Sequence, residues 1–260
     1  MRSFAAVVGV TLLAGLSACG GGGGNSAADA VSKASANLGK IHSGRLHLLL
    51  SLQPLAGNAA GIGLALDGPF SLARHNRLPV ARVHYRQRAG DRQVNATLVS
   101  TGEAAFVQLN GITYQLPPRE TRLLESPGGG RLSMSQLHVS RWIRNPRLTH
   151  PDAQTDRITG QLDPVSALAD VLKATHRPDV PAQDARQLRN AVRTSRVVLI
   201  TRRRDSLLRS LTAAARIELP PSLRARFGQA LGLRIRFELG IDAPNAPVTV
   251  TPPPTSQPLR

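Results

Sequence analysis

The sequence predicts an α+β fold built on one large antiparallel sheet with only a few helices. Many segments alternate apolar and polar residues with a period of two, which is typical of strands with one buried and one solvated face. The connections between the segments of the first half are too short for the crossovers that parallel strands need. Helical spacing of apolar residues occurs in only a few places.

The chain begins with the pattern of an exported protein. Arg2 supplies a short positive region, and residues 4–16 form an uncharged run too short to cross a bilayer as a mature helix. Leu16-Ser17-Ala18 then precedes Cys19, and five glycines occupy residues 20–24. This stretch resembles the lipobox of bacterial lipoproteins, whose cysteine receives a diacylglycerol and a palmitate and becomes the first mature residue.

The lipobox resemblance implies a boundary before Cys19. We expect residues 1–18 to be a signal peptide and residues 19–25 to be the lipidated cysteine with a flexible glycine-rich tether. Two or three acyl chains would anchor the protein stably, because each buried methylene contributes about 0.8 kcal/mol. The expected location is the extracytoplasmic face of the cell membrane, without a span. The alternative is an ordinary signal peptide in which Cys19 is incidental.

The composition limits the fold and the partners. Cys19 is the only cysteine, so no intramolecular disulfide can form. The net charge of +17 comes almost entirely from arginine. Its spread along the chain and the low aromatic content of 3% argue against nucleic acid, and the charge suits an anionic membrane or envelope polymer. Arg202, Arg203 and Arg204 indicate a solvated turn, with a phosphate or headgroup contact as the alternative.

The first half of the chain predicts one helix and then a meander. Ser26 is a suitable N-cap for a helix with apolar residues at three- and four-residue spacing up to Ile41. Period-two alternation then predicts strands over residues 45–52, 61–67, 81–88, 93–100, 104–109 and 112–116. The pair Asn110-Gly111 is a strong signal for a two-residue hairpin.

The second half predicts helices and then long strands. Helices are expected over residues 120–124 and 135–143, after Asp163-Pro164 with Val165, Leu168, Ala169 and Leu172 on one face, and over residues 184–192. Strands are expected over residues 155–162, 197–201, 207–219 and 231–241, with an edge strand over 248–251. We expect one domain over residues 26–251 and a disordered Pro-rich tail over 252–260.

No motif in the sequence indicates catalysis, a cofactor or a metal. The histidines are isolated, there is no second cysteine, and neither a nucleophile elbow nor a phosphate loop occurs. His47 and His84 lie on the wet faces of their predicted strands and are expected at the surface. Trp142 is expected to pack in the core. We therefore predict a protein that is not an enzyme and carries no cofactor.

The apolar faces of the sheet permit two interpretations. The helices and the sheet can form an ordinary closed core, or a curved sheet can close only partly on its helices and leave an apolar cavity for a small molecule. The periodicity of the sequence does not separate them.

The order of elements resembles a known lipoprotein family. The motifs that carry the resemblance are the helix-to-strand junction of residues 38–46, the hairpin of residues 107–116, the strand of residues 158–163 that leads into a helix, and the ending of residues 237–247. Together with the lipobox they are similar to the mycobacterial LppX and LprG lipoproteins and the wider LolA-like superfamily. The resemblance implies a half-barrel of antiparallel strands wrapped over helices, which encloses an apolar cavity for acyl chains.

The resemblance implies a monomeric carrier or chaperone of lipids or lipoproteins, and it transfers only Cys19 as a functional residue. From the apolar strand faces we infer the candidate cavity residues, which are Leu48, Leu50, Leu64, Leu66, Val83, Tyr85, Phe106, Ile235 and Phe237. Plain core packing is the alternative for each. The alternative function is a non-catalytic interaction or sensor module that binds an anionic envelope partner.

Overall fold

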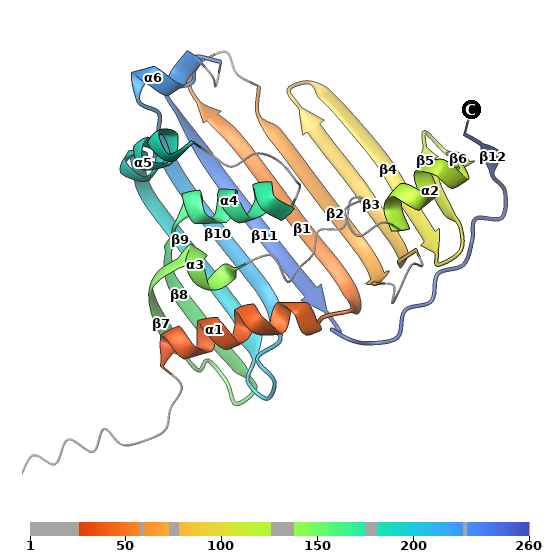
Figure 1. Cartoon of the computed structure of the whole chain (residues 1–260), viewed down its shortest axis with the longest axis horizontal. Coiled ribbons are helices and arrows are strands. Elements are labelled where there is room, and N and C mark those ends of the chain that lie inside the picture. The colour runs from red at the N-terminus through yellow and green to blue at the C-terminus, as the bar shows by residue number, and fades with distance from the viewer. Residues whose placement is uncertain are drawn as a thin grey trace, which may run out of the picture.

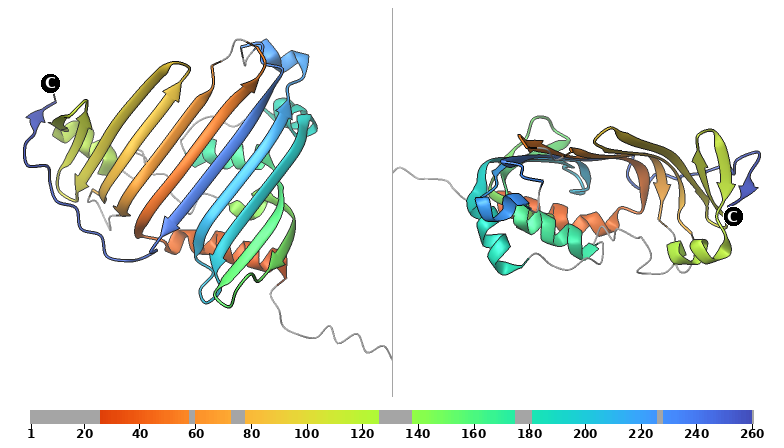
Figure 2. Two further views of the ribbon diagram at one scale, coloured as in Figure 1. Left: turned by 180° about the vertical axis from the view of Figure 1, so that it is seen from behind. Right: turned by 90° about the horizontal axis from the view of Figure 1, so that it is seen from above.

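The protein folds around one wide, curved sheet. The computed structural model describes residues 26–57, 60–72, 78–125, 138–174, 181–225 and 228–259. Within them, twelve strands form a single sheet, and helices α1, α3 and α4 lie across one of its faces (Figures 1 and 2). This confirms the predicted α+β fold with a large curved antiparallel sheet over a few helices.

The elements follow one another in a simple order. The helices are α1 (Ala27–Asn37), α2 (Pro118–Glu125), α3 (Val139–Trp142), α4 (Pro164–Ala174), α5 (Ala182–Ala191) and α6 (Pro221–Arg224), with a 3₁₀ turn at Leu38–Lys40. The strands are β1 (Ser43–Leu55), β2 (Ile62–Ser71), β3 (Val80–Ala89), β4 (Arg92–Thr101), β5 (Ala105–Leu109), β6 (Ile112–Gln115), β7 (Ile143–Thr149), β8 (Thr155–Leu162), β9 (Val192–Arg202), β10 (Leu208–Glu218), β11 (Gly232–Asp242) and β12 (Gln257–Pro258).

The sheet joins the two halves of the chain through its first long strand. The spatial order is β12-β6-β5-β4-β3-β2-β1-β11-β10-β9-β8-β7, so the meander of the first half continues into the strands of the second half. β1 and β11 pair antiparallel from Arg45 opposite Asp242 to Leu55 opposite Gly232. All other pairs are antiparallel except β12 with β6.

Local chemistry explains where several elements begin. The Ser26 hydroxyl accepts a hydrogen bond from the Asp29 backbone N–H, and the Asp29 carboxylate accepts one from the Ser26 N–H, which is a capping box. Ala30, Val31 and Ala34 of α1 are buried against the sheet. Asn110 and Gly111 have φ values of 50° and 83°, as the predicted two-residue hairpin between β5 and β6 requires.

Several sequence predictions are wrong at the ends of elements. The helix expected over residues 135–143 is only the short α3, and the chain then enters β7, which the sequence did not predict. Pro146 within it interrupts the strand signal, and the pairing with β8 shifts register between Arg144 and Arg147. Residues 126–137 lie outside the described part of the chain.

The expected tail is also different. The sequence predicts an edge strand over residues 248–251 and a disordered tail over 252–260, but residues 248–251 form no strand. Instead Gln257–Pro258 forms β12 and pairs in parallel with β6, with Gln257 opposite Tyr114. The Arg82 guanidinium donates to the carbonyl oxygen of Thr251 at 3.0 Å, which holds the segment before β12 against the sheet. Backbone hydrogen bonds to an open edge can order a Pro-rich segment that has little apolar periodicity of its own.

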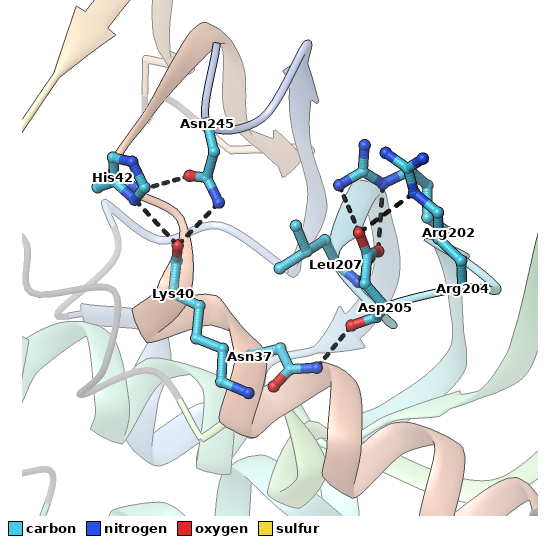
Figure 3. Close-up of polar contacts among 8 residues, drawn as sticks. All are labelled: Asn37, Lys40, His42, Arg202, Arg204, Asp205, Leu207 and Asn245. Carbon is cyan, nitrogen blue, oxygen red and sulfur yellow. Dashed lines mark hydrogen bonds and ion pairs between the residues drawn. The ribbon is translucent and has the colours of Figure 1, made fainter. Parts of the chain in front are cut away.

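A polar cluster fastens α1 and the end of β11 to the same corner (Figure 3). The Asn37 side chain donates to the carbonyl oxygen of Asp205 at 2.8 Å. The Asn245 side chain accepts from the His42 backbone N–H at 3.0 Å and donates to the Lys40 carbonyl oxygen at 3.1 Å. The Asn37 contact joins α1 to the turn between β9 and β10, 168 residues away in the chain. The Asn245 contacts hold the start of β1 beside the end of β11.

The arginine cluster after β9 is a turn with acidic partners. Arg202 forms a bidentate pair with Asp205, and Arg204 lies 3.6 Å from the same carboxylate (Figure 3). Arg203 lies 3.9 Å from Asp156. Each guanidinium therefore lies near a carboxylate, which agrees with the solvated turn that the sequence predicts. These carboxylates reduce the positive charge that the cluster could offer to a phosphate.

The main core lies between the helices and the second half of the sheet. Its fully buried side chains include Ile158 and Val197, both 0% exposed, with Leu199 and Leu211 at 1%. Trp142 belongs to this cluster and is 3% exposed, as predicted. Burying each such aliphatic side chain stabilises the fold by roughly 1.5–3 kcal/mol.

Substitution of Gly68 is expected to destabilise the fold far more than substitution of Gly111. Gly68 has a φ of +150°, and a Cβ there would overlap the carbonyl oxygen of Arg82 on β3. Gly111 has a φ of +83° but nothing within 4 Å of its added Cβ. We expect Gly111→Ala to cost about 1 kcal/mol and Gly68→Ala at least about 3 kcal/mol, because the β2–β3 pairing must shift. Urea unfolding of both variants tests this, and equal losses would contradict it.

Candidate functional site

The inner face of the sheet, defined as the side on which α1, α3 and α4 lie, carries a continuous apolar surface. Leu48 of β1 lies opposite Leu239 of β11 on one side and Leu66 of β2 on the other. Leu50 lies opposite Phe237 and Leu64 in the same way. Because side chains two residues apart share a face, these residues form two adjacent apolar rows.

The register brings eight of the nine candidate residues onto this face. Tyr85 lies opposite Leu66, Ile235 lies opposite Leu52, and Val83 lies opposite Leu98, which itself faces Val107. The eight are Leu48, Leu50, Leu64, Leu66, Val83, Tyr85, Ile235 and Phe237. They come from the four neighbouring strands β11, β1, β2 and β3. The sequence did not show that β1 and β11 are neighbours, because the two strands are far apart in the chain.

Phe106 is a correction to the candidate set. It lies opposite Val99 on β4, and both alternate with residues of the inner face, so its side chain is on the other face of the sheet. It is 7% exposed and Val99 is 5% exposed. The apolar character of Phe106 predicted burial but gave no information on which face is buried near the edge of the sheet.

The described helices cover only one end of the inner face. The main core cluster combines α1, α3 and α4 with residues of β7 to β11 and with Phe70 of β2, and Leu48, Ile235 and Phe237 are partly buried against it. Figure 2 shows these helices beneath one end of the arched sheet, with α2 at the opposite end. Between α4 and α2, no helix of the described residues lies across the inner face.

Four aliphatic side chains stand exposed on the uncovered part, and we call them the apolar patch. They are Ile62 on β2 (48% exposed), Val94 (50%) and Leu98 (44%) on β4, and Ile112 on β6 (44%). The register places all four on the inner face, since Ile62 lies opposite Leu52, Val94 opposite Gln87, Leu98 opposite Val83 and Ile112 opposite Leu109. The sequence does not identify the apolar patch, because alternation indicates an apolar face but not whether other elements cover that face.

A buried carboxylate fixes the aromatic side chain at the border of the covered region. Asp170 of α4, 4% exposed, accepts hydrogen bonds from Trp142 Nε1 and from the His138 backbone N–H, both at 2.8 Å. Trp142 meets Phe237 edge to face with ring centroids 6.4 Å apart. Because a buried carboxylate needs such partners, Asp170 sets the position of the indole within the main core.

A second carboxylate fixes the start of α4. Asp163 Oδ1 accepts hydrogen bonds from the backbone N–H groups of Val165 at 3.1 Å and Ser166 at 3.2 Å, and Oδ2 pairs with Arg144 of β7. Burial by itself raises the pKa of this carboxyl, but the Ser166 N–H and the Arg144 guanidinium outweigh it and lower the pKa below its usual range. This confirms the predicted N-cap. Leu168, expected on the buried face of the same helix, is instead 40% exposed.

The predicted surface histidines lie on the outer face, which is the opposite side of the sheet. His47 contacts the carboxylates of Asp67 and Asp242, the latter at 3.0 Å, and His84 contacts the Thr97 hydroxyl at 3.1 Å. Both rings are exposed. They bind neighbours on the surface and take no part in the inner face.

The described residues lack a metal-binding cluster and a membrane-spanning helix. They contain no group of three or more His, Cys, Asp or Glu side chains placed to hold a metal ion. Within the same part of the chain, no helix is long and apolar enough to cross a membrane. Cys19 lies outside the described residues.

The sequence and the fold of the chain give different results when compared with known proteins. No protein-family model matches the sequence, and no curated protein matches it. Among solved structures, the fold is similar to the crystal structure of LprF from Mycobacterium bovis, with a TM-score of 0.46 and 14% sequence identity over 87% of this chain and 96% of that chain.

Removal of the Asp163 charge is expected to matter only above mildly acidic pH. A carboxyl whose pKa is lowered by folding contributes stability that is complete above its unfolded pKa, near 4, and is lost as the pH falls through the folded pKa. Asp163→Asn keeps a cap acceptor but loses the pairing with Arg144. We expect the variant to be less stable than the parent protein in urea at pH 7, with the difference shrinking below pH 4. A difference independent of pH would contradict the assignment.

Proposed function

We propose that this chain is an envelope lipoprotein, anchored through Cys19, that binds the acyl chains of a lipid or lipoprotein on the inner face of its sheet for carriage or chaperoning. The observation that carries the proposal is the apolar patch. Soluble proteins rarely leave several large aliphatic side chains together in water, and such patches mark binding surfaces. All four side chains lie on one face of the sheet, on strands β2, β4 and β6, with Tyr85 and Leu109 between them on the same face.

One row of the inner face suits an extended acyl chain. From β1 outward it reads Leu48, Leu66, Tyr85, Ala96, Leu109 and Ile112, each opposite the next across paired strands. The row contains no charged residue and spans five strand spacings, about 24 Å at 4.8 Å each. Each methylene buried along it would contribute about 0.8 kcal/mol, so a long acyl chain would bind well even if only part of it is covered.

The same region offers polar groups for a headgroup. The Tyr85 hydroxyl donates to the Gln87 side chain, which faces the inner side next to Val94. Both residues lie in the uncovered part and are not part of the buried core. An apolar surface with a few polar groups is the usual composition of a small-molecule site. The proposal requires binding and release only, so it assigns no catalytic residue.

The anchor at Cys19 would keep the binding surface close to the membrane. Residues 20–25 between Cys19 and the first residue of the described domain are five glycines and an asparagine, a composition that makes a flexible linker. A domain held on such a linker stays close to one membrane, so lipid exchange would occur locally.

Substitution of Cys19 tests the anchor. Cys19→Ala removes the thiol that would carry the acyl chains, so we expect the protein to leave the membrane fraction or to keep its uncleaved signal segment. Fractionation of the native host, with mass spectrometry of the N-terminal peptide, provides the measurement. The matched control is Ser17→Ala, which should leave acylation unchanged. Cleavage after another residue, with an unmodified Cys19, would contradict the proposal.

Charge placed in the apolar patch tests lipid binding. In the chain from residue 20 onward, exported behind an ordinary cleavable signal, Val94→Asp with Leu98→Asp is expected to weaken acyl-lipid binding at least tenfold, equivalent to about 1.4 kcal/mol. Both side chains are about half exposed, so folding should survive the change. Native mass spectrometry and displacement of a fluorescent fatty acid measure the loss.

The same strand provides the control. Asn95→Asp with Gln93→Asp adds the same charge to β4 on the outer face, because these residues alternate with Val94. Binding should be unchanged in this variant. Equal loss in both variants, or absence of bound lipid in the parent protein, would refute the inner face as the lipid site.

A further inference from the structure

The outer face of the sheet gathers arginines that are far apart in the sequence. We define the arginine band by six exposed residues, which are Arg196 on β9, Arg216 on β10, Arg234 and Arg236 on β11, and Arg86 and Arg88 on β3. All six alternate with inner-face residues of their strands. Figure 2 shows that no described helix covers this side of the sheet.

The register sets these arginines side by side. Arg216 lies directly opposite Arg234, which is a like-charge pair. One row across the sheet reads Arg196, Ala214, Arg236, Ser51, Gly63 and Arg88. The residues between the arginines of this row are small, so nothing bulky separates the positive groups. From β9 to β3 the row spans five strand spacings, about 24 Å at 4.8 Å each.

Most of the band has no compensating charge within the described part of the chain. Arg236 pairs with Glu238, and Arg88 donates to the carbonyl oxygen of Gly90 at 3.2 Å. Arg86, Arg196, Arg216 and Arg234 have no carboxylate within 4.0 Å among the described residues. The cluster visible in the sequence, Arg202 to Arg204, differs because its members face Asp205 or Asp156.

This arrangement costs the folded chain stability. Like charges directly opposite one another on adjacent strands are destabilising. Among the described residues, no carboxylate lies within 4.0 Å of Arg216 or Arg234 to offset this repulsion. An external anion would offset it, because guanidinium groups form paired, charge-assisted hydrogen bonds with phosphate and carboxylate.

The shape of the outer face admits a chain-like ligand. Beside the row lies a depression of about 360 Å³, floored by small residues that include Ala65, Ser210, Thr212 and Gly240. It also contains Glu238, which already pairs with Arg236, and Asp67, which already pairs with Arg45 and His47. The depression lets a ligand approach the backbone of the central strands next to the band.

We propose that the arginine band binds a linear polymer with repeated phosphate or carboxylate groups, which lies across the strands from β9 to β3. A row of separated positive groups about 24 Å long matches repeated charges better than a single small anion. A bilayer surface is the less suitable partner, because the exposed aliphatic side chains that would enter it, namely the apolar patch, point to the opposite face. The band is independent of lipid binding on the inner face.

The test uses the mature acylated protein in phosphatidylcholine nanodiscs, with fluorescent polyphosphate and polygalacturonate as probes. We expect Arg196→Gln, Arg216→Gln and Arg234→Gln together to weaken binding of at least one probe tenfold or more. The control removes the same charge from exposed positions off the band through Arg92→Gln, Arg119→Gln and Arg186→Gln, and should change binding less than twofold. Val94→Asp with Leu98→Asp should bind the polymer as the parent protein does.

Three results would overturn the proposal. Equal losses in the two triple variants would mean that only net charge matters. Competition by phosphatidylglycerol vesicles as strong as that of polyphosphate, at equal phosphate concentration, would assign the band to a membrane surface. Failure of the parent protein to bind either polymer would show that the arginine band does not bind a polyanion. Unfolding monitored by the fluorescence of Trp142 confirms that each variant is folded, and loss of lipid binding alone leaves this inference intact.

Discussion

The pairing of β1 with β11 is the constraint on which the rest of the molecule depends. It joins a meander made by the first half of the chain to a second set of strands made by the second half. Without it there would be two smaller sheets, each with its own edges. The polar contacts of Asn245 with His42 and Lys40 hold the start of β1 beside the end of β11. The chain has one cysteine, so this pairing is secured by hydrogen bonds and packing alone.

Once the strands are paired, alternation sorts the side chains into two surfaces of opposite character. In β11, Ile235 and Phe237 point to the inner face and Arg234 and Arg236 to the outer face. The same sorting occurs in each neighbouring strand because the side-chain period is two. The apolar patch and the arginine band are therefore two results of one register, and a one-residue slip of β11 would turn Arg234 and Arg236 to the inner face.

The width of the sheet explains why the inner face is only partly covered. Twelve strands span about 53 Å at 4.8 Å per spacing. A helix of eleven residues such as α1 or α4 is about 16 Å long, enough to cross three or four strands. With Asp163 and Asp170 fixing α4 and its neighbours over the second half of the sheet, the strands from β2 to β6 keep exposed aliphatic side chains. The proposed lipid site lies on the strands that these short helices do not reach.

The sequence alone determined the strands other than β7 and β12, the first helix, the hairpin at Asn110-Gly111 and the N-cap at Asp163, because each depends on residues close together in the chain. It also determined that Leu48, Leu66 and Tyr85 belong to apolar faces. It did not place Phe106 on the correct face or predict β7 and β12, whose formation depends on distant partners. Only the tertiary structure decided which apolar faces are covered and which arginines become neighbours. Those outcomes depend on strand order and register, which join residues as distant as Arg88 and Arg236 and leave no local pattern in the sequence.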